Sequence, residues 1–560
     1  MKKGGLLKTI LLVSTLVLSS CSFSIENIFQ STSKTEEEFP EEEIVSIPEN
    51  TEQNTEENIQ DTNETGPESQ ENNFEEEKED TENENQENIP EETEPKETEP
   101  EETEPNETEP EETDPEVIEP EVIDPEVDQF EEIKTFDLRM PAEFEPCEMV
   151  KMCYPINMPI DAYKTIAEDN KILLLCNPSN WGLSRISQAR SEFENAGVNV
   201  DNVTFIDMNI DDDYTYWVRD FSPFYVFDKT ELSIVDFTYN RSTRTEQNGV
   251  PKKLANYFNM KYSKMDLVHT GGNLMQDGKG TAFSDDLVVR ENSNNKTKVL
   301  NEMKDYTGTD DYVITIDPQG DYIAHIDCWA KIVAPDKIIV AKLPQSNSRY
   351  SYYEQVANEL ANTKCSYGYN YKIYRVEELG GNTVAPYTNS LIANKHVYVP
   401  LGDNSSYNQK ALNVYKEALP GYEIHGIKGY NNDLSFKNTD ALHCRTHEIP
   451  DKNMLFIDSR DVLNGEIEYK DKYVVKTNIV SYSNSDVNES DVKIYYSINN
   501  GDYTESEMSK YKDTTNFTFE FTGLNHGDDI RYYIEASDSS LNKNVDPSCG
   551  SLDPHHFTIK

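Results

Sequence analysis

The stretch Lys331-Ile-Val-Ala-Pro-Asp-Lys-Ile-Ile-Val-Ala-Lys342 contains two short apolar runs, and an amphipathic segment follows at Ser351–Asn362. Short runs rich in Ile and Val predict buried strands, and apolar residues at helical spacing predict a helix that packs on them. The same alternation recurs outward in both directions, with strands expected at Lys171–Cys176, Val203–Asp207 and Ser390–Val399 and a helix at Ser406–Ala418. The sequence therefore predicts an α/β domain over residues 136–462.

A different pattern begins after Asn464, where polar and apolar residues alternate in short segments. Turn residues such as Asn499-Asn500-Gly501 and Asn525-His526-Gly527 separate these segments. The expected strands are Glu466–Tyr469, Tyr473–Val480, Val492–Ser497, Phe517–Phe521 and Asp529–Glu535. This pattern predicts an all-β, immunoglobulin-like sandwich over residues 463–560.

Residues 22–135 differ from both domains in composition. Between Glu26 and Asp128 there are 42 acidic residues and three lysines, and from Pro90 to Pro125 a proline recurs every five residues. Such a segment cannot bury enough apolar surface to offset the loss of chain entropy on folding. We therefore expect a disordered acidic spacer that its prolines and its charge keep extended.

The first 21 residues predict export. Lys2, Lys3 and Lys8 flank an apolar run at 10–18, which is too short to span a membrane and is typical of a signal peptide. The ending Leu18-Ser-Ser-Cys21 resembles the bacterial lipobox, which implies cleavage before Cys21 and attachment of lipid to it. We expect a protein anchored by lipid at the extracellular face of a bacterial membrane, or shed or secreted from there.

The chain has eight cysteines, too few for a disulfide scaffold in a protein of this length. Without Cys21 the number is odd, so at least one thiol is expected to stay free. No cluster of His, Cys and carboxylate residues has the spacing of metal ligands, so the sequence predicts no metal or other cofactor. The acidity of the chain disfavours nucleic acid as a partner.

Four polar segments of the α/β part are candidates for catalysis. Trp217–Asp220 is expected at a strand end that opens into a turn, and Thr388–Ser390 just before a strand. His325–Asp327 is expected to be extended, which would place its first and last side chains on one face. Leu442–Thr446 is bounded by turn-like residues and contains a cysteine.

Together these segments supply a thiol at Cys444, a base at His325 and carboxylates at Asp220 and Asp327. A Cys–His–Asp set alone would also serve a protease or an acyltransferase. A protease has no use for the second carboxylate, whereas two carboxylates suit a planar guanidinium with its fork of donors. The thiolate would attack the central guanidinium carbon, and His325 would act as general acid and then as general base.

Six motifs occur in one order between Pro141 and Pro450, and in this order they resemble the guanidino-modifying deiminases, in particular the Porphyromonas-type bacterial peptidylarginine deiminases. The motifs are Trp217-Val-Arg-Asp220, Tyr239-Asn-Arg241, Thr270-Gly-Gly-Asn273 with Asp277-Gly278, His325-Ile-Asp-Cys-Trp329, Tyr387-Thr-Asn-Ser390 and Thr439-Asp-Ala-Leu-His-Cys444. The resemblance implies a five-bladed α/β propeller (pentein) with its site on the central axis, followed by an immunoglobulin-like domain.

The resemblance also implies residue roles. Asp220 and Asp327 would hold the guanidinium, His325 would carry the proton, Asn389 would position groups in the site, and Cys444 would form a covalent thiouronium. Ammonia would leave and water would complete citrulline. The family implies a pocket lined by Trp217, Tyr322, Ile323 and Thr439.

Substrate choice depends on an arginine pair. In the family an Arg-x-Arg pair binds the carboxylate of a C-terminal arginine, whereas this chain has Arg241-Ser-Thr-Arg244. The expected partners are arginine-containing peptides or proteins. Agmatine and free arginine are alternative substrates, and a surface adhesin or binding lipoprotein without catalysis is an alternative from another class.

Overall fold

The computed structural model describes residues 132–133, 135–179, 183–208, 216–320, 322–379, 387–429, 436 and 440–560. The predicted signal peptide, Cys21 and nearly all of the predicted spacer lie outside these residues, as does Thr439. Among the described residues, no helix is both long and apolar enough to cross a membrane.

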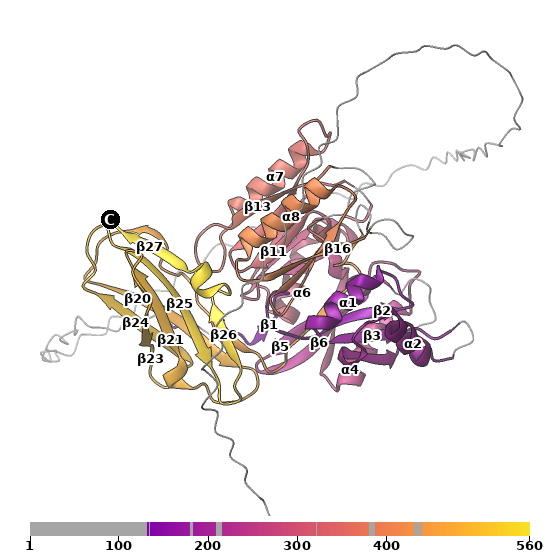
Figure 1. The fold of residues 1–560 in the computed structure, drawn as a ribbon, viewed down its shortest axis with the longest axis horizontal. Helices are drawn as coiled ribbons and strands as arrows, with labels where there is room; N and C mark the ends of the chain where they lie inside the picture. The colour runs from indigo at the N-terminus through magenta and orange to yellow at the C-terminus, as the bar shows by residue number, and fades with distance from the viewer. Residues whose placement is uncertain are drawn as a thin grey trace, which may run out of the picture. The chain divides into compact units, whose positions relative to one another are not determined.

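Five small sheets make up the described chain from residue 138 to residue 450 (Figure 1). In each sheet an antiparallel pair of strands is followed by a parallel strand, and the chain reaches the parallel strand through a helix. Parallel neighbours need such a crossover because the end of one strand and the start of the next lie at opposite ends of the sheet. The predicted α/β class is confirmed.

Each of the five sheets has its own strands and helices. The first has β2 (Cys147–Tyr154), α1 (Ile160–Asp169), β3 (Ile172–Cys176), α2 (Ile186–Ala196) and β4 (Val203–Asp207), and the second β1 (Leu138–Arg139), β5 (Phe224–Asp228), β6 (Glu231–Tyr239), α4 (Val250–Phe258) and β7 (Tyr262–His269). The third has β8 (Met275–Gln276), β9 (Thr281–Asp285), α5 (Leu287–Glu291), α6 (Lys296–Thr307) and β10 (Asp311–Thr315). The fourth has β11 (Ala330–Ala334), β12 (Lys337–Lys342), α7 (Tyr350–Ala361) and β13 (Lys372–Glu377), and the fifth β14 (Leu391–Ala393), β15 (His396–Leu401), α8 (Ser405–Ala418) and β16 (Glu423–Lys428).

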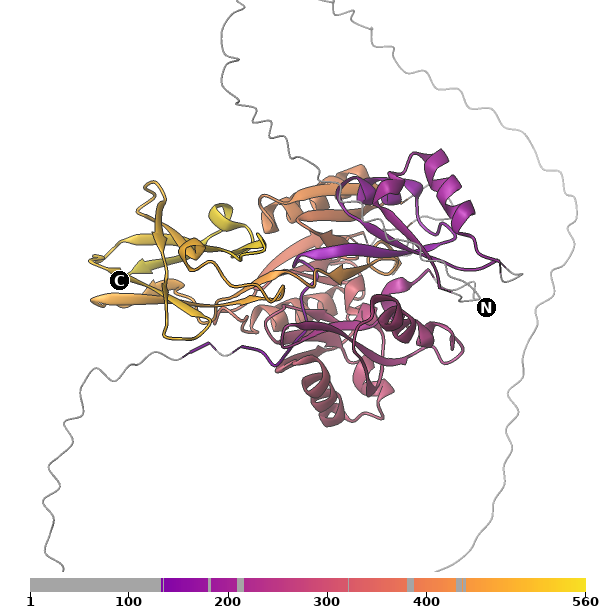
Figure 2. The ribbon, with the colours of Figure 1, turned by 90° about the horizontal axis from the view of Figure 1, so that it is seen from below.

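The first sheet is completed from the far end of the sequence. Strand β17 (His447–Pro450) pairs antiparallel with β2, so that Glu448 lies opposite Val150. Both faces of the first and fourth sheets are covered at β3, β11 and β12, since these strands are buried along their whole length except Lys342. A second view shows α1 and α2 on the outer side of the first sheet (Figure 2).

Three local predictions were wrong. Ser390–Val399 is a hairpin, not one strand, because Asn394 and Lys395 adopt left-handed φ angles of 49° and 68° and reverse the chain between β14 and β15. The expected strand end at Trp217–Asp220 is instead the single helical turn α3 (Val218–Phe221). The segment His325–Asp327 turns into a short 3₁₀ helix, Ile326–Cys328, in which Cys328 N–H bonds to the carbonyl of His325 at 3.1 Å.

Two largely antiparallel sheets follow the five. One has the order β18 (Leu455–Asp458), β20 (Lys472–Ser481), β24 (Asn516–Thr522) and β23 (Ser509–Lys510). The other has the order β19 (Gly465–Ile467), β27 (His555–Ile559), β25 (Asp529–Ser537), β21 (Lys493–Ile498) and β22 (Thr504–Glu507), with β26 (Lys543–Asp546) also paired to β25. The predicted turn at Asn499-Asn500-Gly501 connects β21 to β22, and both asparagines have positive φ angles. Strand β18 precedes the predicted domain start at 463 and belongs to the first of these two sheets.

A buried arginine joins this region to the five sheets. The Nε of Arg139 donates to Tyr482 Oη at 2.7 Å, and its guanidinium lies 3.8 Å from the ring centroid of Phe456. Glu145 pairs with the same guanidinium at 2.8 Å. The Arg139 side chain is only 1 % exposed, and burying its charge is costly. One carboxylate and the aromatic faces stabilise this charge.

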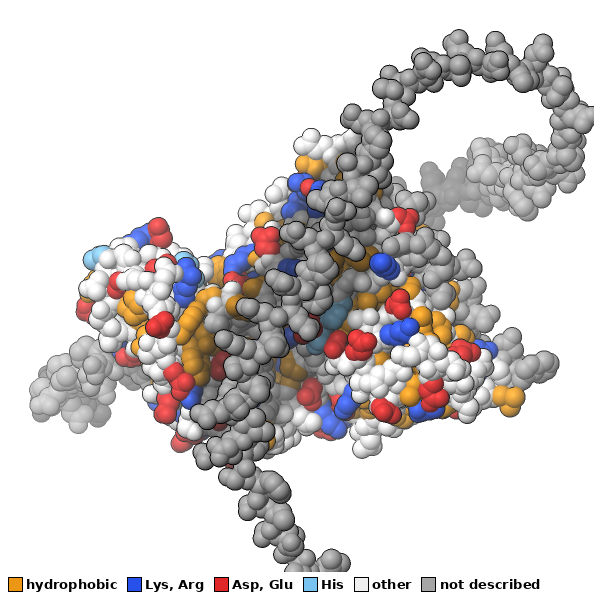
Figure 3. All heavy atoms as spheres, viewed as in Figure 1, with side chains coloured by type: hydrophobic (Ala, Val, Ile, Leu, Met, Phe, Trp, Pro, Cys, Tyr) orange, Lys and Arg blue, Asp and Glu red, His pale blue; other side chains and the backbone are white. Residues whose placement is uncertain are grey.

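The visible surface carries interspersed acidic and basic side chains (Figure 3).

Candidate active site

The turn that carries Cys444 is held by Arg219 of α3. The Nε of Arg219 donates to the carbonyl oxygens of Thr446 at 3.0 Å and His443 at 3.3 Å. In the other direction, the backbone N–H of Arg219 bonds to the carbonyl of Cys444 at 3.1 Å. The thiol is thereby fixed in a buried turn, and Cys444 is 4 % exposed.

The side-chain amide of Asn389 contacts the candidate nucleophile on both sides. Its Nδ2 lies 3.2 Å from Cys444 Sγ, and its Oδ1 accepts the backbone N–H of Cys444 at 3.2 Å. The same Nδ2 lies 3.4 Å from the backbone oxygen of Asp327. This residue, just ahead of β14, therefore sets the distance between the thiol and the Asp327 segment.

A chain of three charged or polar side chains runs beside the thiol. His443 Nδ1 lies 2.7 Å from Asp327 Oδ2, and its Nε2 lies 2.7 Å from Glu143 Oε1. Lys331 and Arg219 also pair with Glu143. Both His443 and Asp327 are completely buried. Cys444 Sγ is 3.6 Å from the same Oδ2 of Asp327.

The carboxylates of Asp327 and Glu143, which lie on either side of His443, stay ionised despite their burial. Burial opposes ionisation of Asp327, but the hydrogen bond and charge of His443, with His325 and Arg219, hold its pKa below the usual range. Burial would also raise the pKa of Glu143. The charges of His443, Lys331 and Arg219 outweigh this effect and hold that pKa well below its usual range. Asp327 thus faces the thiol as an anion.

Asp220 and His325 form a second group, with His325 Nδ1 3.7 Å from Asp220 Oδ1. Burial raises the pKa of Asp220 well above its usual range, and the nearby Asp327 adds to this effect, while Arg241 and Arg244 oppose it. No described residue donates a hydrogen bond to Asp220 Oδ1. A cationic ligand between Asp220 and Asp327 would relieve this repulsion.

Two glycines explain why these groups approach so closely. A Cβ on Gly272 would lie 2.5 Å from His325 Nδ1 and 2.9 Å from Asp220 Oδ1. A Cβ on Gly271 would lie 2.1 Å from the carbonyl oxygen of Arg219. The next residue, Asn273, accepts the backbone N–H of Ile326 at 3.3 Å and so aligns the His325 turn. The motif Thr270-Gly-Gly-Asn273 therefore packs directly against Asp220 and His325 and leaves room for them to approach each other.

Burial raises the pKa of the Cys444 thiol well above its usual range, and the charges of Asp327, Asp440 and Asp220 act in the same direction. In this environment the thiol is protonated at neutral pH. A bound guanidinium would lower the thiol pKa through its positive charge, so that the nucleophile forms when a cation is present.

The expected pocket residues have different surroundings. Arg244 lies over the Trp217 ring, 4.6 Å from its centroid, and its Nη1 donates to Tyr239 Oη at 3.3 Å. Arg241 is near enough to act on the charge of Asp220. Tyr322 is 83 % exposed and Ile323 is half-buried. The altered Arg241-Ser-Thr-Arg244 spacing thus still brings two cations to the Asp220 side of the site.

Glu143, Arg219 and His443 belong to this site although the sequence motifs assigned them no role. His443 precedes the nucleophile, and Arg219 precedes Asp220. Both could have been selected from the sequence because each is next to a predicted catalytic residue. Glu143 lies about 300 positions from His443 in the sequence. Only the pairing of β17 with β2, which brings the two chain regions together, reveals its contact.

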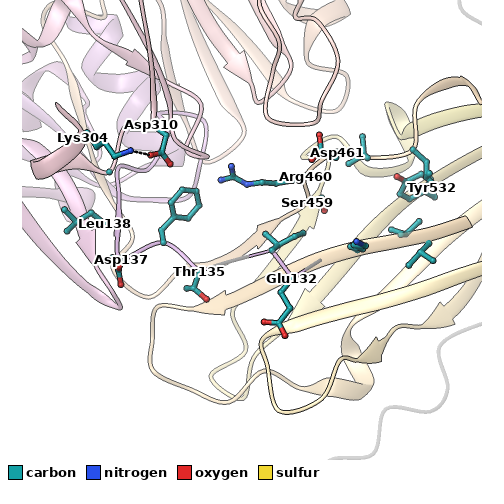
Figure 4. Close-up of a pocket in the computed structure, with 18 of the residues that line it drawn as sticks. Glu132, Thr135, Asp137, Leu138, Lys304, Asp310, Ser459, Arg460, Asp461 and Tyr532 are labelled. Atoms are coloured by element: carbon teal, nitrogen blue, oxygen red, sulfur yellow. Dashed lines mark ion pairs between the residues drawn. The ribbon is translucent and has the colours of Figure 1, made fainter. Parts of the chain in front are cut away.

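A cavity of about 660 Å³ lies elsewhere, where residues 132–133 and 135–138 pass the region that contains Arg460 and Tyr532 (Figure 4). An ion pair between Lys304 and Asp310 lies at its edge. None of the described residues that line it is a cysteine or a histidine. None of the described residues of the six motifs lines this cavity, so the candidate site is the Cys444 cluster.

Comparison with known proteins identifies the family of this part of the chain. The family model described as Porphyromonas-type peptidyl-arginine deiminase matches residues 139–450, which include every residue of the Cys444 cluster. A Legionella pneumophila protein named "Putative agmatine deiminase" is 24% identical over 58% of this chain and 97% of its own length. The Pseudomonas aeruginosa agmatine deiminase is 22% identical over 56% of this chain and 95% of its own.

A solved structure described as "putative agmatine deiminase" has 20% sequence identity and a TM-score of 0.50. It covers 56% of this chain and 96% of its own chain, so the two share a fold over that part.

Proposed function

Because the chain belongs to the Porphyromonas-type peptidyl-arginine deiminase family, whose chemistry is deimination of a guanidino group, we propose that it converts arginine at the C-terminus of peptides to citrulline. The observation that carries this proposal is the placement of Cys444 Sγ 3.6 Å from Asp327 Oδ2, with Asp220 as a second carboxylate in electrostatic contact. A guanidinium held by both carboxylates presents its carbon to the thiol.

Each step of the reaction has a candidate group. The substrate's charge promotes transfer of the Cys444 proton to His325, and the thiolate adds to the guanidinium carbon. The C–N bond breaks as His325 protonates the departing nitrogen, which leaves as ammonia and yields a thiouronium. His325 then takes a proton from water, the hydroxide adds to the same carbon, and the C–S bond breaks to give citrulline and the thiol. Asn389 holds the thiol throughout.

The arginine pair supports a peptide end as the substrate. Arg241 and Arg244 both act on the charge of Asp220, so a ligand bound there feels two nearby cations. Such cations attract a carboxylate and repel the ammonium group of agmatine. Agmatine remains the second candidate because curated relatives carry that name.

The experiment compares three substrates with one enzyme preparation. We expect citrulline from a peptide that ends in arginine, slower reaction with the same peptide amidated, and little reaction with agmatine. Cys444→Ala should abolish all three reactions. Faster turnover of agmatine than of the peptide acid would replace the proposed substrate, and absence of product from any guanidine, including free arginine, would favour the non-catalytic adhesin.

The finer description of the fold is also proposed. The five repeated sheets are what a five-bladed propeller requires, and we infer that they surround the Cys444 cluster as blades. The two C-terminal sheets suit an immunoglobulin-like sandwich, for which packing and display are the simplest role.

Export and anchoring rest on the sequence of residues 1–21 alone. We propose that Cys21 is lipidated and that the acidic segment holds the enzyme away from the membrane. Mass spectrometry of the protein from its native membrane should find a diacylglyceryl group on Cys21, and Cys21→Ala should release the protein from the membrane fraction.

A further inference from the structure

A second group of histidines and carboxylates lies outside the candidate active site. Asp169 is the last residue of α1, His396 is the first residue of β15, and His425 and Glu423 are on β16. Because β14 runs antiparallel to β15, His396 lies opposite Ala393, at the end of the sheet away from Asn389. The group is therefore separate from the Cys444 cluster.

Three ligand-type atoms converge in this group. His396 Nδ1 lies 3.1 Å from His425 Nε2 and 3.3 Å from Asp169 Oδ2, and the remaining side of the triangle is 3.7 Å. Nitrogen and oxygen ligands of a tetrahedral zinc ion, each 2.0–2.2 Å from the metal, lie about 3.3 Å from one another. Glu423 Oε2 lies farther away, 3.9 Å and 4.0 Å from the two histidine nitrogens, and its side chain is 73% exposed, so it would have to rotate inward to act as a fourth ligand.

The surrounding structure holds these atoms in place by other contacts. Asn170, next to Asp169, donates from Nδ2 to Tyr398 Oη at 2.8 Å. The Tyr398 ring stacks on His425 at 5.0 Å between centroids. Asn394, in the hairpin turn before His396, donates to Asn170 Oδ1 at 3.0 Å. The ligands are thus preorganised on α1 and two strands, as a metal site requires.

The charges of the group also favour a cation. Among the residues that the structure describes, no Lys or Arg forms an ion pair with Asp169 or Glu423. Neutral imidazoles place a lone pair on the facing nitrogens when their hydrogens sit on the outer ones. The side chains of His396, His425 and Asp169 are 19%, 24% and 27% exposed, so an ion from solvent can reach them.

We propose that Asp169, His396 and His425, with Glu423 as the fourth ligand, form a zinc site that ties α1 to strands β15 and β16. Two nitrogen and two oxygen ligands suit Zn²⁺ better than Mg²⁺ or Ca²⁺, which prefer oxygen ligands alone and higher coordination numbers. Helix α1 belongs to the first sheet and the strands to the fifth. The ion stabilises the contact between these two sheets and takes no part in the Cys444 chemistry.

The test is zinc titration of the full chain after removal of metal with a chelator. We expect one Zn²⁺ per chain by calorimetry and, at about 100-fold excess over Kd, a rise in Tm of about 3–5 °C. His396→Asn and His425→Gln should each abolish both effects, and Glu423→Gln should weaken binding by about tenfold. The matched control is His556→Gln, which changes an exposed histidine paired with Asp529 at 2.6 Å, and it should bind zinc like the unchanged protein.

Cobalt(II) distinguishes this site from zinc bound to a cysteine. We expect the visible absorption of a tetrahedral ion without a thiolate charge-transfer band, unchanged in Cys444→Ala. Circular dichroism of each variant establishes that it is folded. Zinc binding that survives in a folded His396→Asn, a thiolate band, or no binding at about 100 μM zinc would overturn the proposal and leave a hydrogen-bonded His–His–Asp cluster in its place.

Discussion

The buried group Glu143–His443–Asp327 and the half-exposed group Asp169–His396–His425 use the same residue types under opposite electrostatic conditions. In the first, Lys331 and Arg219 pair with Glu143, and His443 lies between two carboxylates. In the second, two histidines face one carboxylate, and no described Lys or Arg pairs with it. Composition alone therefore does not separate a catalytic group from a metal-binding group. The difference lies in whether a Lys or Arg side chain already neutralises the carboxylate, because a carboxylate without such a partner can still bind a metal cation.

The largest expected effect is loss of the buried cation in the first group. Arg219→Gln removes the partner of Glu143 and Glu448 and two bonds to the Cys444 turn. Breaking a buried pair costs about 3–5 kcal/mol, so the free energy of unfolding should fall by that amount in denaturant titrations. The control Arg531→Gln removes an exposed pair with Asp529 and should change stability by less than about 0.5 kcal/mol. Equal losses would remove the distinction between buried and exposed cations.

The next effect concerns His443, which holds Asp327 in its ionised form. His443→Asn removes two charge-assisted contacts, each worth about 1.5–3 kcal/mol, so kcat/KM should fall by about 10²–10³-fold. The pKa of Asp327 should rise, because its main donor is lost. Zinc binding should not change. Unaltered citrulline formation would show that the first group has no influence on catalysis.

A third effect tests the close packing of Gly272 against His325 and Asp220. Gly272→Ala inserts a Cβ 2.5 Å from His325 Nδ1 and 2.9 Å from Asp220 Oδ1. A displacement of this size should lower kcat/KM by about 10²-fold, mainly through kcat. In Gly249→Ala the new Cβ has nothing within 4 Å, so its kinetics should match those of the unchanged enzyme. The site would be more adaptable than the close contacts imply if the two variants behaved alike.

The smallest expected effect is a shift in the pH dependence of activity. The pKa values of both Asp220 and Cys444 are raised, first by burial and then by neighbouring carboxylates. Both groups must lose a proton to bind and attack a cation, so kcat/KM should rise with pH, by about tenfold per unit between the two pKa values and more steeply below both. Asp440 acts on both groups, and Asp440→Asn should move this rise to lower pH. A rate that falls as pH increases from about 6 to about 8 would contradict the assignment.

The sequence predicted the α/β class and the positions of most strands, because short Ile- and Val-rich runs separated by turn residues are strong local signals. The two apolar runs of Lys331–Lys342, predicted as strands, are β11 and β12. The hairpin at Asn394-Lys395 was missed because two residues other than glycine adopt left-handed angles there. The turns at Trp217–Asp220 and His325–Asp327 were missed because tertiary contacts, such as Asn273 with Ile326, determine them.

The structure brings Cys444, Asp327 and Asn389 into contact, and Asp220 with His325 beside them, as the predicted chemistry requires. The sequence did not predict His443 as a link between Asp327 and Glu143. It also predicted no metal ligands, because the ligand rule relies on short spacings. Asp169, His396 and His425 are far apart in the chain and meet only through the contact between α1 and β16.

Strand β17 has a consequence for how the protein matures. It pairs with β2 about 300 residues earlier, so the first sheet stays incomplete until nearly the whole catalytic region has been synthesised. Pairing over such a separation raises the contact order and slows folding. Cys444 lies three residues before β17, so its turn is positioned by the same late event. The turn that carries the thiol is therefore among the last parts of residues 139–450 to be organised, and a chain cut short before β17 lacks the strand that positions it.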